Sequence, residues 1–205
     1  MKDHFLTLAA ASQSIYKVKG SRFIGTASPV SGQNDVDAFI VKMRKHYYDA
    51  THHCYAYRIG LEPKLIYRYY DDGEPSGTAG KPIFDVITGL KITDCICMVI
   101  RYFGGIKLGT GGLGRAYSHC ARETLQNADI VKKYRKAFYQ IIFSYEHIGS
   151  VMSVLSRFPC IMLNTEYGEK AAISLEIRWK EWIPLKRELI NRTKGQIEFL
   201  TEMEE

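Results

Sequence analysis

The sequence predicts an α+β protein built from two domains, and three observations lead to this expectation. Segments with alternating apolar residues and segments with a helical apolar period both occur along the 205-residue chain. Basic side chains concentrate in residues 1–136, with 20 Lys and Arg against 12 Asp and Glu, whereas residues 137–205 have 8 against 10. A charged stretch at residues 129–136 has no apolar period. We therefore expect domains at residues 1–132 and 137–205.

The first domain is expected to begin with extended segments at residues 14–19 and 21–30, separated by Gly20. Residues 52–60 and 65–70 are rich in Tyr and Ile and predict a hairpin. Residues 83–90 and 113–126 predict helices on either side of a buried strand at residues 95–102. An earlier helix, capped by Asn34, is predicted from apolar residues at helical spacing: Val36, Phe39, Ile40, Met43 and Tyr47.

The second domain has a regular order of elements. Strands are predicted at residues 137–145, 160–167, 171–179 and 196–200, and helices at residues 147–158 and 183–193. The resulting β-α-β-β-α-β order is that of a ferredoxin-like domain, in which both helices cover one face of an antiparallel sheet. Such a fold does not by itself assign a function.

Composition excludes several classes of protein. The apolar runs are interrupted within ten residues, which excludes a membrane span, and the N-terminus lacks a secretory signal, so we expect a cytoplasmic protein. Five cysteines in a chain of this length do not suggest a disulfide framework, and their spacing does not suggest zinc. The net charge of +6, concentrated in the first domain, favours a polyanionic partner, although it is also compatible with ordinary solubility.

The most informative segment is rich in glycine and lies between the strand at residues 95–102 and the helix at residues 113–126. Its N–H groups can converge on an anion at the positive end of the helix, with basic side chains beside them. We therefore predict an anion-binding or nucleic-acid-binding site and assign no catalytic residue. The candidate residues are Arg101, Gly104, Gly105, Lys107, Gly109, Gly111, Gly112 and Arg115, together with Lys81, His52 and Arg22.

Other interpretations of the same segment stay open. Gly109, Gly111 and Gly114 match a dinucleotide-binding pattern, but the acidic residue expected about twenty positions later would be followed by a basic stretch rather than end a strand. The sequence at residues 111–114 also resembles the phosphate loop of small-molecule kinases. Asp71, Asp72 and Glu74 can hold Mg²⁺ that bridges to phosphates, or they can cap backbone N–H groups in a solvated turn.

Aromatic residues suggest a second kind of contact. Eight tyrosines fall within residues 47–102, interleaved with Arg58, Arg68 and Arg101. Such side chains stack on the bases of single-stranded nucleic acid, although about half of the tyrosines must belong to the core.

Three strings of residues resemble the YigZ/IMPACT family: Ala-Thr-His-His-Cys-Tyr-Ala-Tyr-Arg at 50–58, Asp-Asp-Gly-Glu-Pro-Ser-Gly-Thr-Ala-Gly at 71–80, and Arg-Tyr-Phe-Gly-Gly-Ile-Lys-Leu-Gly at 101–109. The resemblance covers most of residues 14–130, and the tail resembles the second domain of the bacterial YigZ branch. It implies a first domain like the second domain of a small-subunit ribosomal protein, and a second domain like a ferredoxin-like domain of elongation factor G. It also implies a link to translation, which the eukaryotic branch regulates.

The leading hypothesis is a non-enzymatic, translation-linked regulator that binds RNA or the ribosome through the basic glycine-rich segment, with no cofactor. A protein partner from the translation machinery is a further expectation. The alternative is a Mg²⁺-dependent enzyme that binds a nucleotide or phosphometabolite with the same segment. A third hypothesis is a protein-docking regulator in which the glycine-rich segment is only structural.

Overall fold

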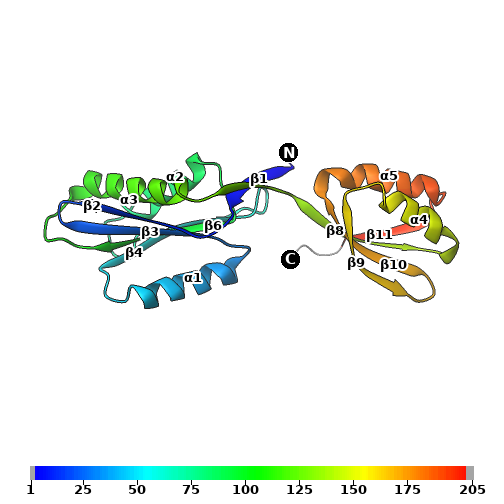
Figure 1. Cartoon of the computed structure of the whole chain (residues 1–205), viewed down its shortest axis with the longest axis horizontal. Helices are drawn as coiled ribbons and strands as arrows, with labels where there is room; N and C mark the ends of the chain where they lie inside the picture. The colour runs from blue at the N-terminus through cyan, green and yellow to red at the C-terminus, as the bar shows by residue number, and fades with distance from the viewer. Residues whose placement is uncertain (1–2, 202–205) are drawn as a thin grey trace. The chain divides into compact units, whose positions relative to one another are not determined.

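The computed structural model describes residues 3–201 and divides into two compact units. The N-terminal unit spans Phe5–Lys133, and the C-terminal unit comprises the chain from Tyr134 onward together with Asp3 and His4. Their boundary therefore falls inside the charged stretch at residues 129–136. Figure 1 labels the elements of both units.

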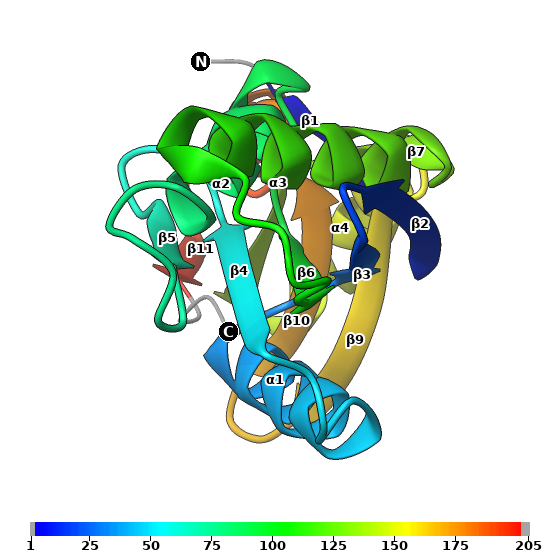
Figure 2. The same cartoon turned by 90° about the vertical axis from the view of Figure 1, so that its left-hand side faces the viewer.

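The N-terminal unit is built on a five-stranded antiparallel sheet in the order β2-β3-β6-β4-β5. The strands are β2 (Ser12–Val18), β3 (Ser21–Pro29), β6 (Cys95–Tyr102), β4 (His52–Ile59) and β5 (Ile66–Tyr70). One face is covered by α1 (Gln33–His46), and the other by α2 (Gly80–Gly89) and α3 (Gly109–Gln126). Figure 2 shows α2 and α3 side by side on one face and α1 on the opposite face.

Both faces of the sheet carry a hydrophobic core. Successive residues of β6 point to opposite faces, so Cys97 and Val99 pack beneath α2 and α3, whereas Met98 and Ile100 pack beneath α1. This double burial explains why β6 is an almost continuous apolar run. The predicted hairpin is also present, because β4 pairs with β5 in antiparallel register.

Two local predictions in the N-terminal unit are wrong, and one pair of strands was not predicted. Gly32, not Asn34, is the N-cap of α1, and its first turn is instead closed by the Asp35 carboxylate, which accepts a hydrogen bond from Ser31 N–H at 2.7 Å. The helix α3 begins at Gly109, four residues before the predicted start. Part of the charged stretch is a strand, β7 (Ile130–Tyr134), which pairs with β1 (His4–Leu8) in a separate two-stranded sheet.

The C-terminal unit has the predicted ferredoxin-like order. Its antiparallel sheet runs β11-β8-β10-β9, formed by β11 (Ile197–Thr201), β8 (Lys136–Phe143), β10 (Ala171–Arg178) and β9 (Cys160–Tyr167). The helices α4 (Ile148–Leu155) and α5 (Trp182–Arg192) cover one face of this sheet (Figure 1). Its core is separate from the two cores of the N-terminal unit and includes Ile141, Leu175 and Leu185.

In the described part of the chain, no helix is both long enough and apolar enough to cross a bilayer. All five cysteines are free, and four of them are buried. Burial raises the pKa of the Cys95 thiol to about 12 and that of the Cys120 thiol to about 11, so both are neutral core side chains at physiological pH.

Candidate anion-binding site

The glycine-rich segment forms an exposed loop, residues 103–108, followed directly by the first turn of α3. Within residues 3–201, no acceptor pairs with the N–H groups of Gly105, Ile106 or Lys107. The first N–H groups of any α-helix also lack partners inside the helix, and in α3 they belong to glycines and a threonine with no side-chain cap. The loop and the helix start therefore present main-chain donors to solvent.

The first half of this loop is held by hydrogen bonds to Ser21, at the start of β3, and to Thr51, just before β4. Gly104 N–H donates to Ser21 Oγ at 3.2 Å, and Phe103 N–H donates to Thr51 Oγ1 at 3.1 Å. A Cβ atom on Gly104 would lie 1.9 Å from the carbonyl carbon of Gly20, so only glycine allows the two backbones to approach this closely. The anchored half holds the exposed half in place.

A buried polar network lies beneath this anchor. Arg101 is only 5% exposed, and its Nη1 donates to Glu74 Oε1 at 2.7 Å while its Nη2 donates to Ser21 Oγ at 3.3 Å. Tyr117 OH donates to the same Glu74 oxygen at 2.8 Å, and His52 Nε2 lies 3.8 Å from it. Arg101 and His52, both sequence candidates for anion binding, are thus engaged inside the protein.

The network continues to a buried thiol. Cys54 Sγ donates to Asp71 O at 2.9 Å and contacts Tyr117 OH at 3.4 Å. Burial raises the pKa of the Cys54 thiol well above its ordinary value, so the sulfur is protonated and is not a nucleophile. His52 Nδ1–H donates to Asp72 O at 2.8 Å, which fixes the orientation of the imidazole ring.

The three carboxylates that the sequence proposed for Mg²⁺ point to different partners. Asp72 accepts hydrogen bonds from Arg44 Nη2 and from His53 N–H, both at 2.6 Å, and Glu74 belongs to the buried network. Over residues 3–201, no group of three His, Cys, Asp or Glu side chains is arranged to hold a metal ion. Asp71 caps backbone N–H groups of the turn into α2, at 2.9, 3.0 and 2.8 Å from Gly77, Ala79 and Gly80.

The remaining basic candidates are exposed, but they do not all lie together. Arg115 lies against the first turn of α3, directly after the exposed loop, because its Nη1 is 3.6 Å from the position of a Cβ on Gly111. Lys81 pairs with Asp85 one turn later on α2. Arg22 lies on the α1 side of the sheet, where its guanidinium stacks over Tyr102 at 4.3 Å, so it is separated from the α3 surface. Lys107 and Arg115 are the two candidates that remain beside the loop.

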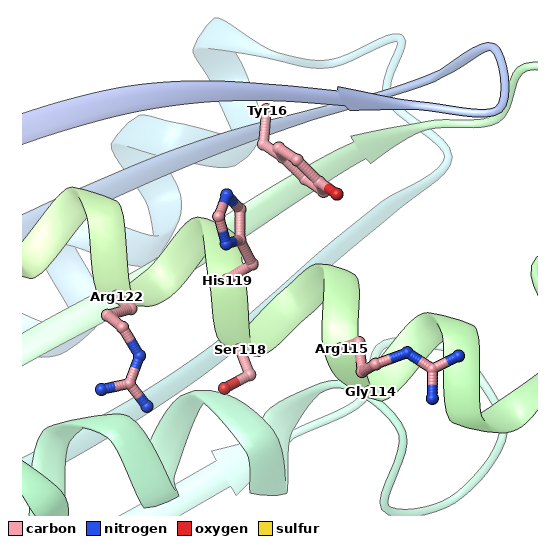
Figure 3. A pocket seen from close by; sticks show the side chains of 6 residues that line it. All are labelled: Tyr16, Gly114, Arg115, Ser118, His119 and Arg122. Carbon is pink, nitrogen blue, oxygen red and sulfur yellow. The ribbon is translucent and has the colours of Figure 1, made fainter.

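A groove extends this surface along α3, as Figure 3 shows. We call it the α3 groove; it has a volume of about 530 Å³. His119 points toward Tyr16 of β2, and the two ring centroids are 4.3 Å apart. Across the described residues, neither Arg115 nor Arg122 has an ion-pair partner, whereas His119 lies 3.4 Å from Glu123. The lining residues are Tyr16, Gly114, Arg115, Ser118, His119 and Arg122.

Sequence reasoning did not assign Arg122, Ser118 and Tyr16 to the site. The spacing of Arg115, His119 and Arg122 in the sequence places these three residues on one polar face of the helix, but it does not by itself assign Arg122 to the site. Tyr16 comes from a distant strand, so its position opposite the helix follows only from the packing of β2 beside α3.

This chain is similar in sequence and in structure to known proteins. A sequence profile described as "Impact N-terminal domain" matches residues 19–125, which is more than half of the chain. The chain belongs to the IMPACT family. A second profile, described as a domain of unknown function (DUF1949), matches residues 141–196. The IMPACT family member YvyE of Bacillus subtilis is 33% identical over 196 residues, covering 96% of this chain and 90% of that protein.

Other similar proteins extend over both units. The IMPACT family member YigZ of Escherichia coli is 28% identical over 199 residues, covering 97% of this chain and 98% of that protein. A solved crystal structure, titled as that of a hypothetical protein, has a TM-score of 0.74 at 28% identity and covers both chains completely. The whole two-unit chain is therefore shared with other members of the IMPACT family.

The strings of residues that resemble the IMPACT family meet in the buried network. His52 and Cys54 come from the first string, Asp71 and Glu74 from the second, and Arg101 from the third. In this structure their hydrogen bonds and ion pairs connect β4, β6 and the turn before α2 beneath the glycine-rich loop. The exposed N–H groups and cations of the candidate site come from the end of the third string and from α3.

Proposed function

We propose that this member of the IMPACT family is a non-enzymatic, translation-linked regulator that binds RNA or the ribosome. The contact surface is formed by the exposed half of the loop, the first turn of α3 and the α3 groove. One observation carries the proposal: the main-chain N–H groups of residues 105–107 have no acceptor among the described residues, and they run directly into the first turn of α3, against which Arg115 lies without an ion-pair partner in the same part of the chain. Phosphate oxygens accept hydrogen bonds from such donors.

The geometry of α3 suits an extended polyanion better than a single small ion. Arg115 and Arg122 are seven residues apart, which separates their Cα atoms by about 10.5 Å along the helix axis. Figure 3 shows the Arg115 side chain extending along α3 away from Arg122, so their charges cover different parts of the surface. Lys107 adds a third cation on the loop. A nucleic-acid backbone offers phosphates at several positions along such a row.

The link to translation rests on family membership, because the eukaryotic branch of the IMPACT family regulates translation. The N-terminal unit also carries an excess of basic residues, 17 Lys and Arg against 11 Asp and Glu over residues 5–133. Such a surface attracts RNA over long distances and makes binding sensitive to salt.

The Mg²⁺-dependent alternative has less support. Asp71, Asp72 and Glu74 are engaged by backbone N–H groups, Arg44 and the buried network, so binding a cation there would break several short hydrogen bonds. A thermal-shift screen with nucleotides, with and without Mg²⁺, tests this alternative directly, because a ligand at 100 times its Kd stabilises by about 2.7 kcal/mol.

The main experiment measures the affinity for a fluorescein-labelled RNA, by anisotropy, as a function of KCl concentration. The variant Arg115→Ala/Arg122→Ala should bind more weakly and lower the log–log salt slope by about 1.4, from about 0.7 per lost phosphate contact on a single strand. The control Lys42→Ala/Lys45→Ala removes the same charge from α1, on the opposite face of the sheet, and should keep the wild-type slope. Equal effects of the two double variants would contradict a defined site on α3.

A further inference from the structure

A cluster of aromatic rings lies on the same face of the sheet as the α3 groove. Tyr67 and Tyr69 of β5 pack against Phe84 of α2, with centroid distances of 4.9 and 5.8 Å. We call these three residues the aromatic shelf. The rings of Tyr67 and Phe84 are nearly parallel, at 26°, so Phe84 stacks on one face of the Tyr67 ring.

The outer side of the shelf is open to solvent. Tyr67 is 54% exposed and Tyr69 is 42% exposed, although both rings touch the protein. β5 is the last strand of its sheet, and all five of its residues are exposed. Residues two apart on a strand share a face and lie about 6.8 Å apart, so the two tyrosines present a pair of adjacent rings.

Helix α2 lies between the shelf and the near side of the α3 groove, whereas Tyr16 on the far side of the groove belongs to β2, the edge strand opposite β5. The helix contributes Phe84 to the shelf, and its Pro82 lies beside Gly114 in the wall of the groove. Strands β5 and β2 are four strand spacings apart, or about 19 Å, a distance that several nucleotides of an extended strand can span. Lys81, at the start of α2, provides a cation on the way, since an exposed pair such as that with Asp85 contributes little and opens easily.

We propose that the aromatic shelf stacks unpaired bases of an RNA whose phosphates lie in the α3 groove, so that the ligand of this surface is single-stranded. This inference rests on the proposed function and narrows its ligand. Bases in a duplex are already stacked on one another and paired, and they cannot reach the shelf without unpairing. Bases of a single strand have free faces, and aromatic side chains bind these faces with little sequence preference.

The experiment compares two labelled RNAs of equal length with the full chain: a 12-nucleotide uridine strand and a 12-base-pair duplex. The variant Tyr67→Ala/Tyr69→Ala should lose between about 5- and 150-fold in affinity for the single strand for each ring that stacks a base. Its affinity for the duplex should change less than twofold. Tyr67→Phe keeps the ring and should bind like the wild type.

Tyr48 supplies the matched control, because it is 84% exposed, follows α1 and makes no stacking contact with another ring in the described chain. Tyr48→Ala should leave both affinities unchanged. Thermal unfolding of each variant separates loss of binding from loss of folding.

Three outcomes would overturn the inference. An equal loss of affinity for the single strand and the duplex in Tyr67→Ala/Tyr69→Ala would show that the shelf does not recognise unpaired bases. An unchanged affinity for both RNAs would show that the shelf does not contact RNA, and would favour β5 as an edge strand that pairs with a peptide. In both cases the salt dependence of Arg115→Ala/Arg122→Ala could still support RNA binding. Absence of wild-type binding to either RNA would instead remove the proposed function together with the inference.

Discussion

The buried pair between Arg101 and Glu74 offers the sharpest test of how this unit is held together. Glu74→Gln keeps the shape of the side chain and an oxygen that can accept from Tyr117, but it removes the charge that faces a guanidinium only 5% exposed. Leaving one partner of a buried pair uncompensated costs about 3–5 kcal/mol. With a urea m-value of about 2 kcal/mol/M, the lower figure moves the unfolding midpoint of the N-terminal unit down by about 1.5 M.

Unfolding in urea should be followed by far-UV circular dichroism and tryptophan fluorescence together. Both tryptophans, Trp179 and Trp182, lie in the C-terminal unit, which has its own core, so their fluorescence midpoint should stay at the wild-type value. In the double variant Glu74→Gln/Arg101→Met, the loss should be smaller than the sum of the single losses by at least 1 kcal/mol. A loss below 1 kcal/mol for Glu74→Gln would refute the reasoning that this charge compensates Arg101.

Three further predictions concern neighbouring features. Gly104→Ala should lower stability by about 2 kcal/mol or more in thermal unfolding, because the new Cβ meets the Gly20 backbone at 1.9 Å. Burial lowers the pKa of His53, so the unfolded chain binds the proton more readily, and stability should fall as pH decreases below about 6.5; His53→Gln should flatten this dependence between pH 7 and 5 in urea unfolding. Iodoacetamide should label only Cys160 in the native protein, as mass spectrometry can check, because the other four thiols are buried.

Much of the fold could be predicted because local patterns and final packing agree. The strand β6 is buried on both faces and is correspondingly apolar throughout, and the C-terminal unit has clear changes between strand and helix periods. The pairing of β7 with β1 could not be predicted in this way. Residues 130–134 are charged and mostly exposed, and their partner strand lies more than a hundred residues earlier.

The start of α3 was missed for a different reason. Its first turn contains Gly109, Gly111 and Gly112, and glycine is a poor helix former, so propensity alone begins the helix too late in the sequence. Packing against α2 and the sheet overrides this preference. The early start bears on the proposed function, because it places the unpaired N–H groups of the helix directly after the exposed loop.

The sequence located the candidate site in part: it indicated which residues are exposed on α3, but it did not indicate which candidates are buried. A charged residue in a sequence is expected at the surface, and the sequence contains no local sign that Arg101 would be 5% exposed. Its counter-charge, Glu74, lies 27 residues earlier, in the turn after β5, and the pairing of β6 with β4 and of β4 with β5 brings the two together. Arg115, by contrast, follows the helical period and is exposed as its spacing indicates.

Because some candidate residues are buried and others are exposed, a substitution can reduce binding in two distinguishable ways. Residues of the buried network, such as Arg101 and Glu74, can affect a ligand only by changing how firmly the loop is held, so their effect on binding must be accompanied by a loss of stability. Arg115 and Arg122 have no ion-pair partner in the part of the chain that the structure describes, and they can affect a ligand without changing stability. The residues of the three strings therefore hold the fold of the N-terminal unit together, and the proposed anion contact is best tested on the exposed face of α3.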